Sequence, residues 1–164
     1  MGLFYGFIHS PFVGTEAFEP YLELIASVSG GLIGFLGQPT TVVDTSVNSP
    51  DFSMRIVRGC DAIEPTAAFV AAVVASPVSL WAKIPGILIG TMALVVINVV
   101  RLVSLFFVGV YVPSVLDFMH FDFWQAAFIV LAICFWAIWV QWATRPRPGQ
   151  IAVSRPEPPP NPVA

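Results

Sequence analysis

The longest apolar stretch of the chain carries an arginine inside it. Residues 85–111 are long enough to cross a bilayer as one helix, yet they contain Asn98 and Arg101. An arginine at the centre of such a helix costs about 2.5–3.5 kcal/mol on insertion scales, and it rarely persists without a function. The stretch therefore predicts a membrane-spanning helix whose polar face is turned toward other helices.

The composition agrees with a membrane protein and excludes several other classes. The chain is 57% hydrophobic and 10% charged, whereas soluble domains are about 25% charged. This excludes an ordinary soluble enzyme and a disordered chain. Seven basic residues and a net charge of −3 cannot form a phosphate-binding surface, so nucleic acid is excluded as a partner and the lipid bilayer is expected. Two cysteines with no zinc-ligand spacing predict no disulfide framework, no metal and no cofactor.

The predicted fold is an all-α polytopic membrane protein, a small bundle of three to four transmembrane helices. The candidate spans are residues 19–37, 65–81, 85–111 and 123–142. A tight turn is expected at residues 82–86, around Lys83. Residues 38–64 contain turn formers between two short β-branched or alternating runs, 40–43 and 52–57, which predicts a small hairpin in a loop on the membrane surface.

We expect one membrane-embedded catalytic domain, residues 1–144, followed by a tail. Residues 145–164 are rich in proline and are expected to be disordered or polyproline-like in the cytoplasm. Residues 1–13 are apolar but short and are broken by Pro11. They resemble an interfacial segment, or the end of a span whose beginning is missing, more than a signal peptide.

The distribution of basic residues predicts the orientation. Lys83 and the three tail arginines in the cytoplasm leave the two arginines of the 38–64 loop outside. This places Cys60 and His120 together on the extracytoplasmic face of the cell membrane, in a multi-pass protein.

Arg101 is the strongest candidate for a functional residue. It lies about ten residues, roughly 15 Å, below the outer end of its span. Its long side chain can reach upward from there. Asn98, three residues earlier, shares its helix face and is a candidate supporting residue. The alternative is an arginine that only reaches the outer headgroups.

Cys60 is expected to be a lone thiol where the surface loop re-enters the membrane. Cys134 lies too deep in the last span to bridge to it, and is expected to be a packing residue. Cationic groups near Cys60 are expected to favour its thiolate. The alternative is a cysteine with a structural role only.

His120 completes the set of candidate residues. It lies in the predicted loop 113–122, two residues before Asp122, a second candidate supporting residue. A thiolate that attacks a carbonyl, an imidazole that transfers the proton and a guanidinium that stabilises the oxyanion make a cysteine protease or transpeptidase site.

The order of these residues resembles the exosortase/archaeosortase family. Cys60 lies in Gly-Cys-Asp-Ala-Ile, Arg101 in Asn-Val-Val-Arg-Leu, and His120 precedes a final span that opens with Trp-Gln. The resemblance covers residues 38–142, and the chain is most similar to the compact exosortase H type. One departure is Asp61-Ala62, where the family pattern has a small polar residue followed by glycine.

The resemblance implies a membrane-embedded cysteine protease or transpeptidase. Its partners would be secreted proteins with a C-terminal motif, a transmembrane helix and a basic tail. Cleavage would form a thioester on Cys60, and the new carboxyl end would pass to an unknown acceptor or to water. Arg101 would stabilise the oxyanion or the substrate, and His120 would be the general acid and base.

Two readings without this chemistry stay open. In the first, the chain is a non-enzymatic membrane scaffold or assembly subunit in which Asn98 and Arg101 hold helices together. In the second, it is a small transporter or channel lined by Thr91, Asn98 and Arg101, although the chain has no internal repeat.

Overall fold

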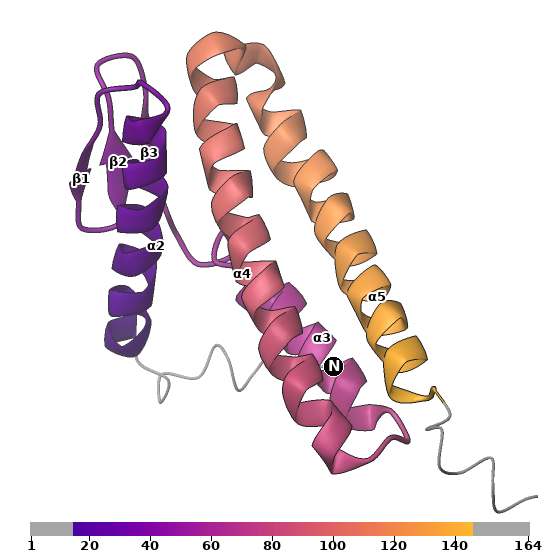
Figure 1. The fold of residues 1–164 in the computed structure, drawn as a ribbon. Helices are drawn as coiled ribbons and strands as arrows, with labels where there is room; N and C mark the ends of the chain where they lie inside the picture. Colours follow the sequence, from indigo (N-terminus) through magenta and orange to yellow (C-terminus); the bar gives the residue numbers. More distant parts are fainter. Residues whose placement is uncertain (1–14, 146–164) are drawn as a thin grey trace, which may run out of the picture.

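The computed structural model describes residues 15–145 (Figure 1). Residues 1–13 and the tail beyond Arg145, for which predictions were made above, lie outside the described residues. The elements in chain order are α2 (Thr15–Phe35), β1 (Thr41–Val43), β2 (Ser46–Asn48), β3 (Ser53–Arg55), α3 (Ile63–Ala75), α4 (Leu80–Tyr111), η1 (Pro113–Val115), η2 (Phe118–Phe123) and α5 (Trp124–Ala143).

The turn predicted at residues 82–86 is wrong, because α4 runs without interruption through Pro85. A proline inside a helix lacks an N–H donor and disturbs the hydrogen bonds of the preceding turn. The carbonyl that loses its partner is that of Trp81, four residues earlier and in the first turn of α4, so one hydrogen bond near the helix start is lost and the helix continues. One residue further on, the indole of Trp139 on α5 donates to the backbone oxygen of Ala82 at 3.0 Å.

The predicted span 65–81 is divided between two helices. α3 has 13 residues, about 20 Å at 1.5 Å per residue, which is too short to cross a bilayer. It ends at Ser76, whose extended backbone (φ −67°, ψ 136°) is the conformation that the following Pro77 favours. The chain turns there and re-enters as the start of α4, so α3 and α4 form a helical hairpin.

The predicted loop 113–122 is largely helical. η1 is a 3₁₀ turn, and η2 is a π-helical turn that continues directly into α5. Among residues 15–145, two helices are long and apolar enough to cross a membrane, Leu80–Tyr111 and Phe118–Ala143. α2 and α3 are helical but fall short in composition or length, so the predicted number of three to four spans is not confirmed.

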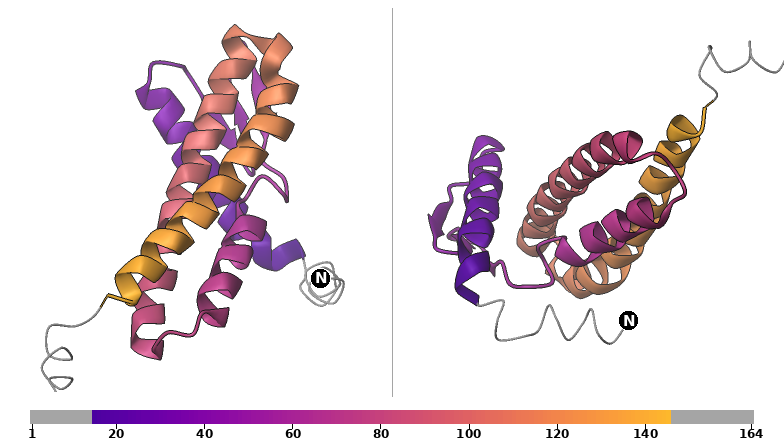
Figure 2. Two further views of the ribbon diagram at one scale, coloured as in Figure 1. Left: turned by 90° about the vertical axis from the view of Figure 1, so that its right-hand side faces the viewer. Right: turned by 90° about the horizontal axis from the view of Figure 1, so that it is seen from below.

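α2 runs beside α4 in the same direction. The hydroxyl of Tyr21 near its start donates to the backbone oxygen of Asp61 at 2.9 Å, and Gln38 beyond its end donates to the hydroxyl of Tyr111 at 3.3 Å. Figure 2 shows α3, α4 and α5 grouped together, with α2 and the sheet to one side. α4 is therefore the helix shared by both halves.

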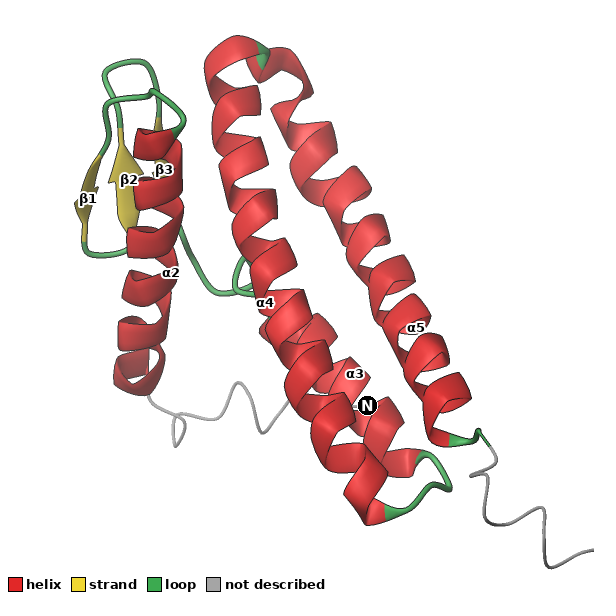
Figure 3. Ribbon diagram, in the orientation of Figure 1, coloured by secondary structure: helices red, strands yellow, loops and turns green. Residues whose placement is uncertain are grey.

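The predicted hairpin is a sheet of three antiparallel strands in the order β1-β2-β3 (Figure 3). The first and third strands fall within the two predicted runs. The middle strand was not predicted, because its three residues contain one apolar side chain, Val47. That side chain is fully buried against α2 and α4, and it holds the sheet to the helices.

Two apolar clusters meet along α4. The first joins α2, the sheet and α4, and its buried members include Ile25, Val47 and Leu102. The second joins α3, α4 and α5 and includes Leu94 and Phe128. The segment between β3 and α3 crosses from the first cluster to the second, and it carries the predicted nucleophile.

Candidate active site

The segment that carries Cys60 is bounded by two residues with left-handed backbone. Gly59 has φ +93° and Ala62 has φ +58°. The backbone N–H of Cys60 donates to Val57 O at 3.0 Å, which closes a tight turn just before the thiol. Left-handed backbone costs a non-glycine residue roughly 1–2 kcal/mol. The backbone at position 62 therefore favours glycine, the residue that the sequence comparison led us to expect there.

Asp61 anchors the end of this segment. Its carboxylate accepts a hydrogen bond from the backbone N–H of Ile63 at 3.2 Å, a local cap at the start of α3. Its backbone oxygen accepts the bond from Tyr21 on α2. Asp61 is 4% exposed, so a buried carboxylate lies directly beside the thiol. From the sequence, Asp61 was notable only as a departure from the family pattern, although its adjacency to Cys60 was a signal of this role.

Cys60 and His120 meet in the folded chain. Cys60 Sγ lies 3.5 Å from His120 Nε2. Cys60 is 7% exposed, and His120 is half-buried with its ring 4.7 Å from that of Phe121. At this separation the imidazole is within reach of the thiol proton.

Burial raises the pKa of the Cys60 thiol above its ordinary value. The positive charge of Arg101 lowers this pKa and the negative charge of Asp61 raises it, but the loss of solvent is the larger effect. A cation near Cys60 thus favours its thiolate, as expected, but burial outweighs this effect and the pKa is raised overall.

Arg101 lies inside the bundle. It is 7% exposed, and its guanidinium carbon is 5.6 Å from the centre of the Phe128 ring on α5. A guanidinium over an aromatic face is attracted by the ring quadrupole. Its Nε has no hydrogen-bond partner. The side chain is held among helices, near enough to act on the charge of Cys60.

Asn98 is completely buried on the same side of α4. Its exposed fraction is 0%, and neither Nδ2 nor Oδ1 has a hydrogen-bond partner. Residues at i+3 and i+4 share a helix face. Asn98 accordingly shares its face with Arg101 and with the buried Leu94.

Asp122 stays a prediction, and its side chain is exposed. The carboxylate that acts electrostatically on His120 is that of Asp117. Asp117 precedes His120 by three residues, a spacing that joins side chains on a helix. The proximity of Asp117 and His120 was not predicted, because residues 113–122 were expected to form a loop and not a helix.

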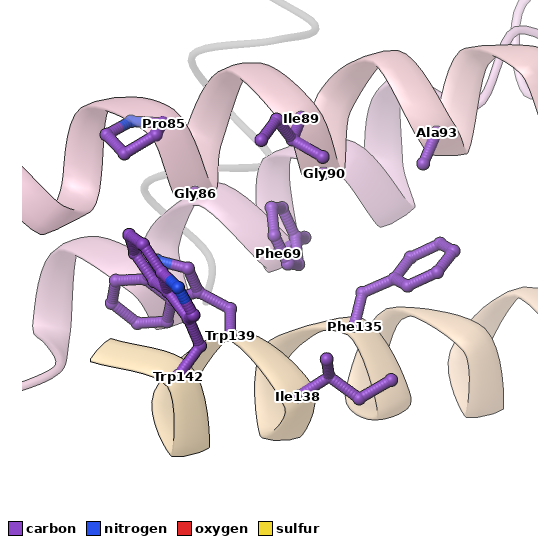
Figure 4. Close-up of a pocket in the computed structure, with 10 residues that line it drawn as sticks. All are labelled: Phe69, Pro85, Gly86, Ile89, Gly90, Ala93, Phe135, Ile138, Trp139 and Trp142. Carbon is purple, nitrogen blue, oxygen red and sulfur yellow. The ribbon is translucent and has the colours of Figure 1, made fainter. Parts of the chain in front are cut away.

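A metal site is absent from the described residues. No group of three or more His, Cys, Asp and Glu side chains in residues 15–145 is placed to hold a metal ion. An apolar cavity of about 360 Å³ lies between the N-terminal half of α4 and the C-terminal half of α5. Figure 4 shows Phe69 directed toward Gly90, and Trp139 beside Gly86. Cys134, expected to be packed, is exposed on the outer surface of α5.

A family model described as transmembrane exosortase matches residues 1–136. No curated protein and no solved structure matches the chain. The match includes the Cys60 segment, all of α4 and the η2 turn that carries His120.

Proposed function

We propose a function from one established premise: the chain belongs to the transmembrane exosortase family. In this proposal it is a membrane-embedded cysteine peptidase or transpeptidase that processes the C-terminal sorting signals of secreted proteins. The substrates would carry a short motif, a transmembrane helix and a basic tail. The products would be a substrate joined to an acceptor nucleophile, or one released by water.

The observation that carries the proposal is the contact between Cys60 Sγ and His120 Nε2 at 3.5 Å. The two residues come from distant segments, a loop and a π-helical turn, and neither needs the other for its local structure. The buried cation Arg101 acts on the same sulfur. A thiol, a base and a cation in one place make up the set that acyl transfer requires.

The mechanism follows from these positions. His120 Nε2 takes the proton from Cys60 Sγ, and the sulfur attacks the scissile carbonyl carbon. Arg101 stabilises the negative oxygen of the tetrahedral intermediate. The C–N bond then breaks, His120 returns the proton to the leaving amine, and a thioester remains on Cys60. A second nucleophile, deprotonated by His120, attacks the thioester and regenerates the thiol.

The membrane setting suits such a substrate. α4 and the η2–α5 helix are long and apolar enough to cross the bilayer, so the helix of a substrate would lie beside them in lipid. We place the site toward the extracytoplasmic face of the cell membrane, in keeping with the distribution of basic residues.

Co-expression with a candidate substrate tests the proposal. The substrate is a secreted protein from the same genome with a C-terminal motif, helix and basic tail. Wild type, Cys60→Ala, Cys60→Ser, Arg101→Ala and His120→Ala are compared by immunoblot for cleavage and for their own membrane levels. We expect cleavage by wild type alone at equal levels. Cleavage by Cys60→Ala would refute the proposal.

A scaffold role is the second candidate, favoured by the contact between Arg101 on α4 and Phe128 on α5. It predicts that Cys60→Ala has no phenotype and that Arg101→Ala reduces the amount of folded protein. Blue native gels of the same variants separate this outcome from loss of catalysis.

A further inference from the structure

The amide of Asn98 is a buried polar group for which the fold provides no partner. Its donor and its acceptor are both enclosed and unpaired. Leaving a buried hydrogen-bonding group unsatisfied costs roughly 1–3 kcal/mol, so unpaired groups of this kind are rare in native structures. A leucine has a similar branched shape and would carry no such cost.

The position of Asn98 relative to the Cys60 segment follows from the two clusters. Ala62 belongs to the cluster that contains Leu94, and Cys60 belongs to the cluster that contains Leu102. Leu94, Asn98 and Leu102 are each four residues apart on α4, so they form one row along the helix. Asn98 is the middle member of this row, between a residue in the cluster of Ala62 and a residue in the cluster of Cys60.

Arg101 supplies a second unpaired donor one turn away. Its Nε is buried without a partner, and it lies on the same face as Asn98. Two enclosed and unpaired donors share one helix face, and the charge of one of them acts on Cys60. Donors of this kind make up an oxyanion hole. Such donors have no partner in the resting enzyme, because the oxygen that accepts their hydrogen bonds becomes an oxyanion only in the tetrahedral intermediate.

We propose that Asn98 is a catalytic residue whose Nδ2–H donates to the oxyanion alongside Arg101. This inference rests on the proposed function and adds a residue to its site. Cys60 and Asn98 are both buried in this structure, so the proposal requires that substrate binding expose them together.

Two small reagents test the inference without the natural substrate. p-Nitrophenyl acetate acylates the thiol: the S–C bond forms through a tetrahedral oxyanion, the thiol proton goes to His120, and p-nitrophenolate leaves. Iodoacetamide alkylates the same sulfur with loss of iodide, and no oxyanion forms. The ratio of the two rates therefore measures the oxyanion hole separately from the exposure and ionisation of Cys60.

The full chain is purified in detergent with Cys134→Ser, so that Cys60 is the single thiol. In Asn98→Leu we expect the acylation rate to fall about 10²–10³-fold, the effect of losing one oxyanion donor, with alkylation unchanged. Asn98→Ala, which removes the amide and leaves a smaller side chain, gives a second measurement if Asn98→Leu does not fold. Ser29→Ala is the matched control, because Ser29 is equally buried with an unpaired hydroxyl but lies on α2.

The outcomes separate the two proposals. An unchanged rate ratio in Asn98→Leu, with rapid acylation of wild type, overturns the role of Asn98 and leaves the proposed function intact. A wild-type Cys60 that acylates no faster than a simple thiol overturns both. A fall in Ser29→Ala equal to that in Asn98→Leu assigns the effect to packing and also overturns the inference.

Discussion

The reactivity of Cys60 depends on burial and on two charges of opposite sign. Burial raises its pKa, Arg101 counteracts this effect and Asp61 adds to it. The fraction of thiolate at neutral pH is therefore small, and it increases as the pH rises toward the elevated pKa. At a pH below the pKa, raising that pKa by one lowers the thiolate fraction about tenfold.

The rate of alkylation by iodoacetamide reports this balance. We expect the wild-type rate to rise with pH and to reach its midpoint above that of a free cysteine. Asp61→Asn removes the negative charge and keeps a capping side chain, so it should lower the pKa of Cys60 and increase the rate at pH 7. Arg101→Met should raise the pKa of Cys60 and decrease the rate, by up to about tenfold if that pKa rises by one.

Stopped-flow or mass-spectrometric labelling over a pH series provides the measurement, with Cys134→Ser in every sample. The urea-denatured chains serve as controls and should all react alike. If Asp61→Asn and Arg101→Met changed the alkylation rate in the same direction, the opposite effects assigned to these two charges would be contradicted.

Ala62 is a residue at which backbone geometry restricts the choice of side chain. Its φ of +58° is unfavourable for any residue with a Cβ, and most unfavourable for a β-branched one. We expect Ala62→Gly to change the unfolding free energy by less than about 1 kcal/mol, because relief of strain offsets the lost methyl group. Ala62→Val should cost about 1–3 kcal/mol.

Thermal unfolding in detergent measures both effects. Ala67→Val is the control, since this residue lies in the regular helix α3 and is only partly buried. Equal losses in Ala62→Val and Ala67→Val would show that the left-handed backbone does not limit the position.

At the scale of elements, the contacts of α4 with α3 and with α5 depend on small residues. A Cβ at Gly90 would overlap the ring of Phe69, and a Cβ at Gly86 would overlap the indole of Trp139. The close approach lets the short helix α3 bury Phe69 at 2% exposure. In lipid, where helices gain little from the hydrophobic effect, such close packing is a main source of association.

Two glycine substitutions test this dependence. Gly90→Ala should destabilise the chain by about 1–3 kcal/mol, because Phe69 must shift. Gly31→Ala should stabilise it by about 0.5–1 kcal/mol, since no atom lies within 4 Å of the new methyl group and alanine favours a helix. The unfolding free energies of the two variants are measured by unfolding in increasing amounts of a denaturing detergent. A neutral Gly90→Ala would refute the packing argument.

At the scale of the whole molecule, α4 organises the site. It contributes Arg101 and Asn98, carries both apolar clusters, and joins η2 and α5 through a short connection. Tyr21 on α2 holds the Cys60 segment by a hydrogen bond to Asp61, and the η2 turn supplies His120. The nucleophile, the base and the cation of the candidate site thus come from three different segments beside one helix.

The orientation in the membrane is a prediction that belongs to this scale. In a chain without native cysteines (Cys60→Ser, Cys134→Ser), we expect Ser114→Cys to react with a membrane-impermeant maleimide on intact cells. Thr144→Cys, at the opposite end of the bundle, should react only after lysis. Both positions are exposed, so access alone does not separate them. The reverse pattern would show that the site faces the cytoplasm.

The sequence by itself determined the features that depend on local chemistry. Long apolar runs predicted α4 and α5, and an arginine in lipid is costly enough to mark Arg101 without any structure. Residue order predicted the exosortase family, and the family match over residues 1–136 confirms it. The hairpin was predicted in part from its turn formers.

Only the tertiary structure decided which groups meet. The contact between Cys60 and His120 spans 60 residues, and the charge of Asp61 matters because folding buries it beside the thiol. Hydropathy and turn propensity describe neighbours along the chain, whereas desolvation and unpaired polar atoms depend on neighbours in space.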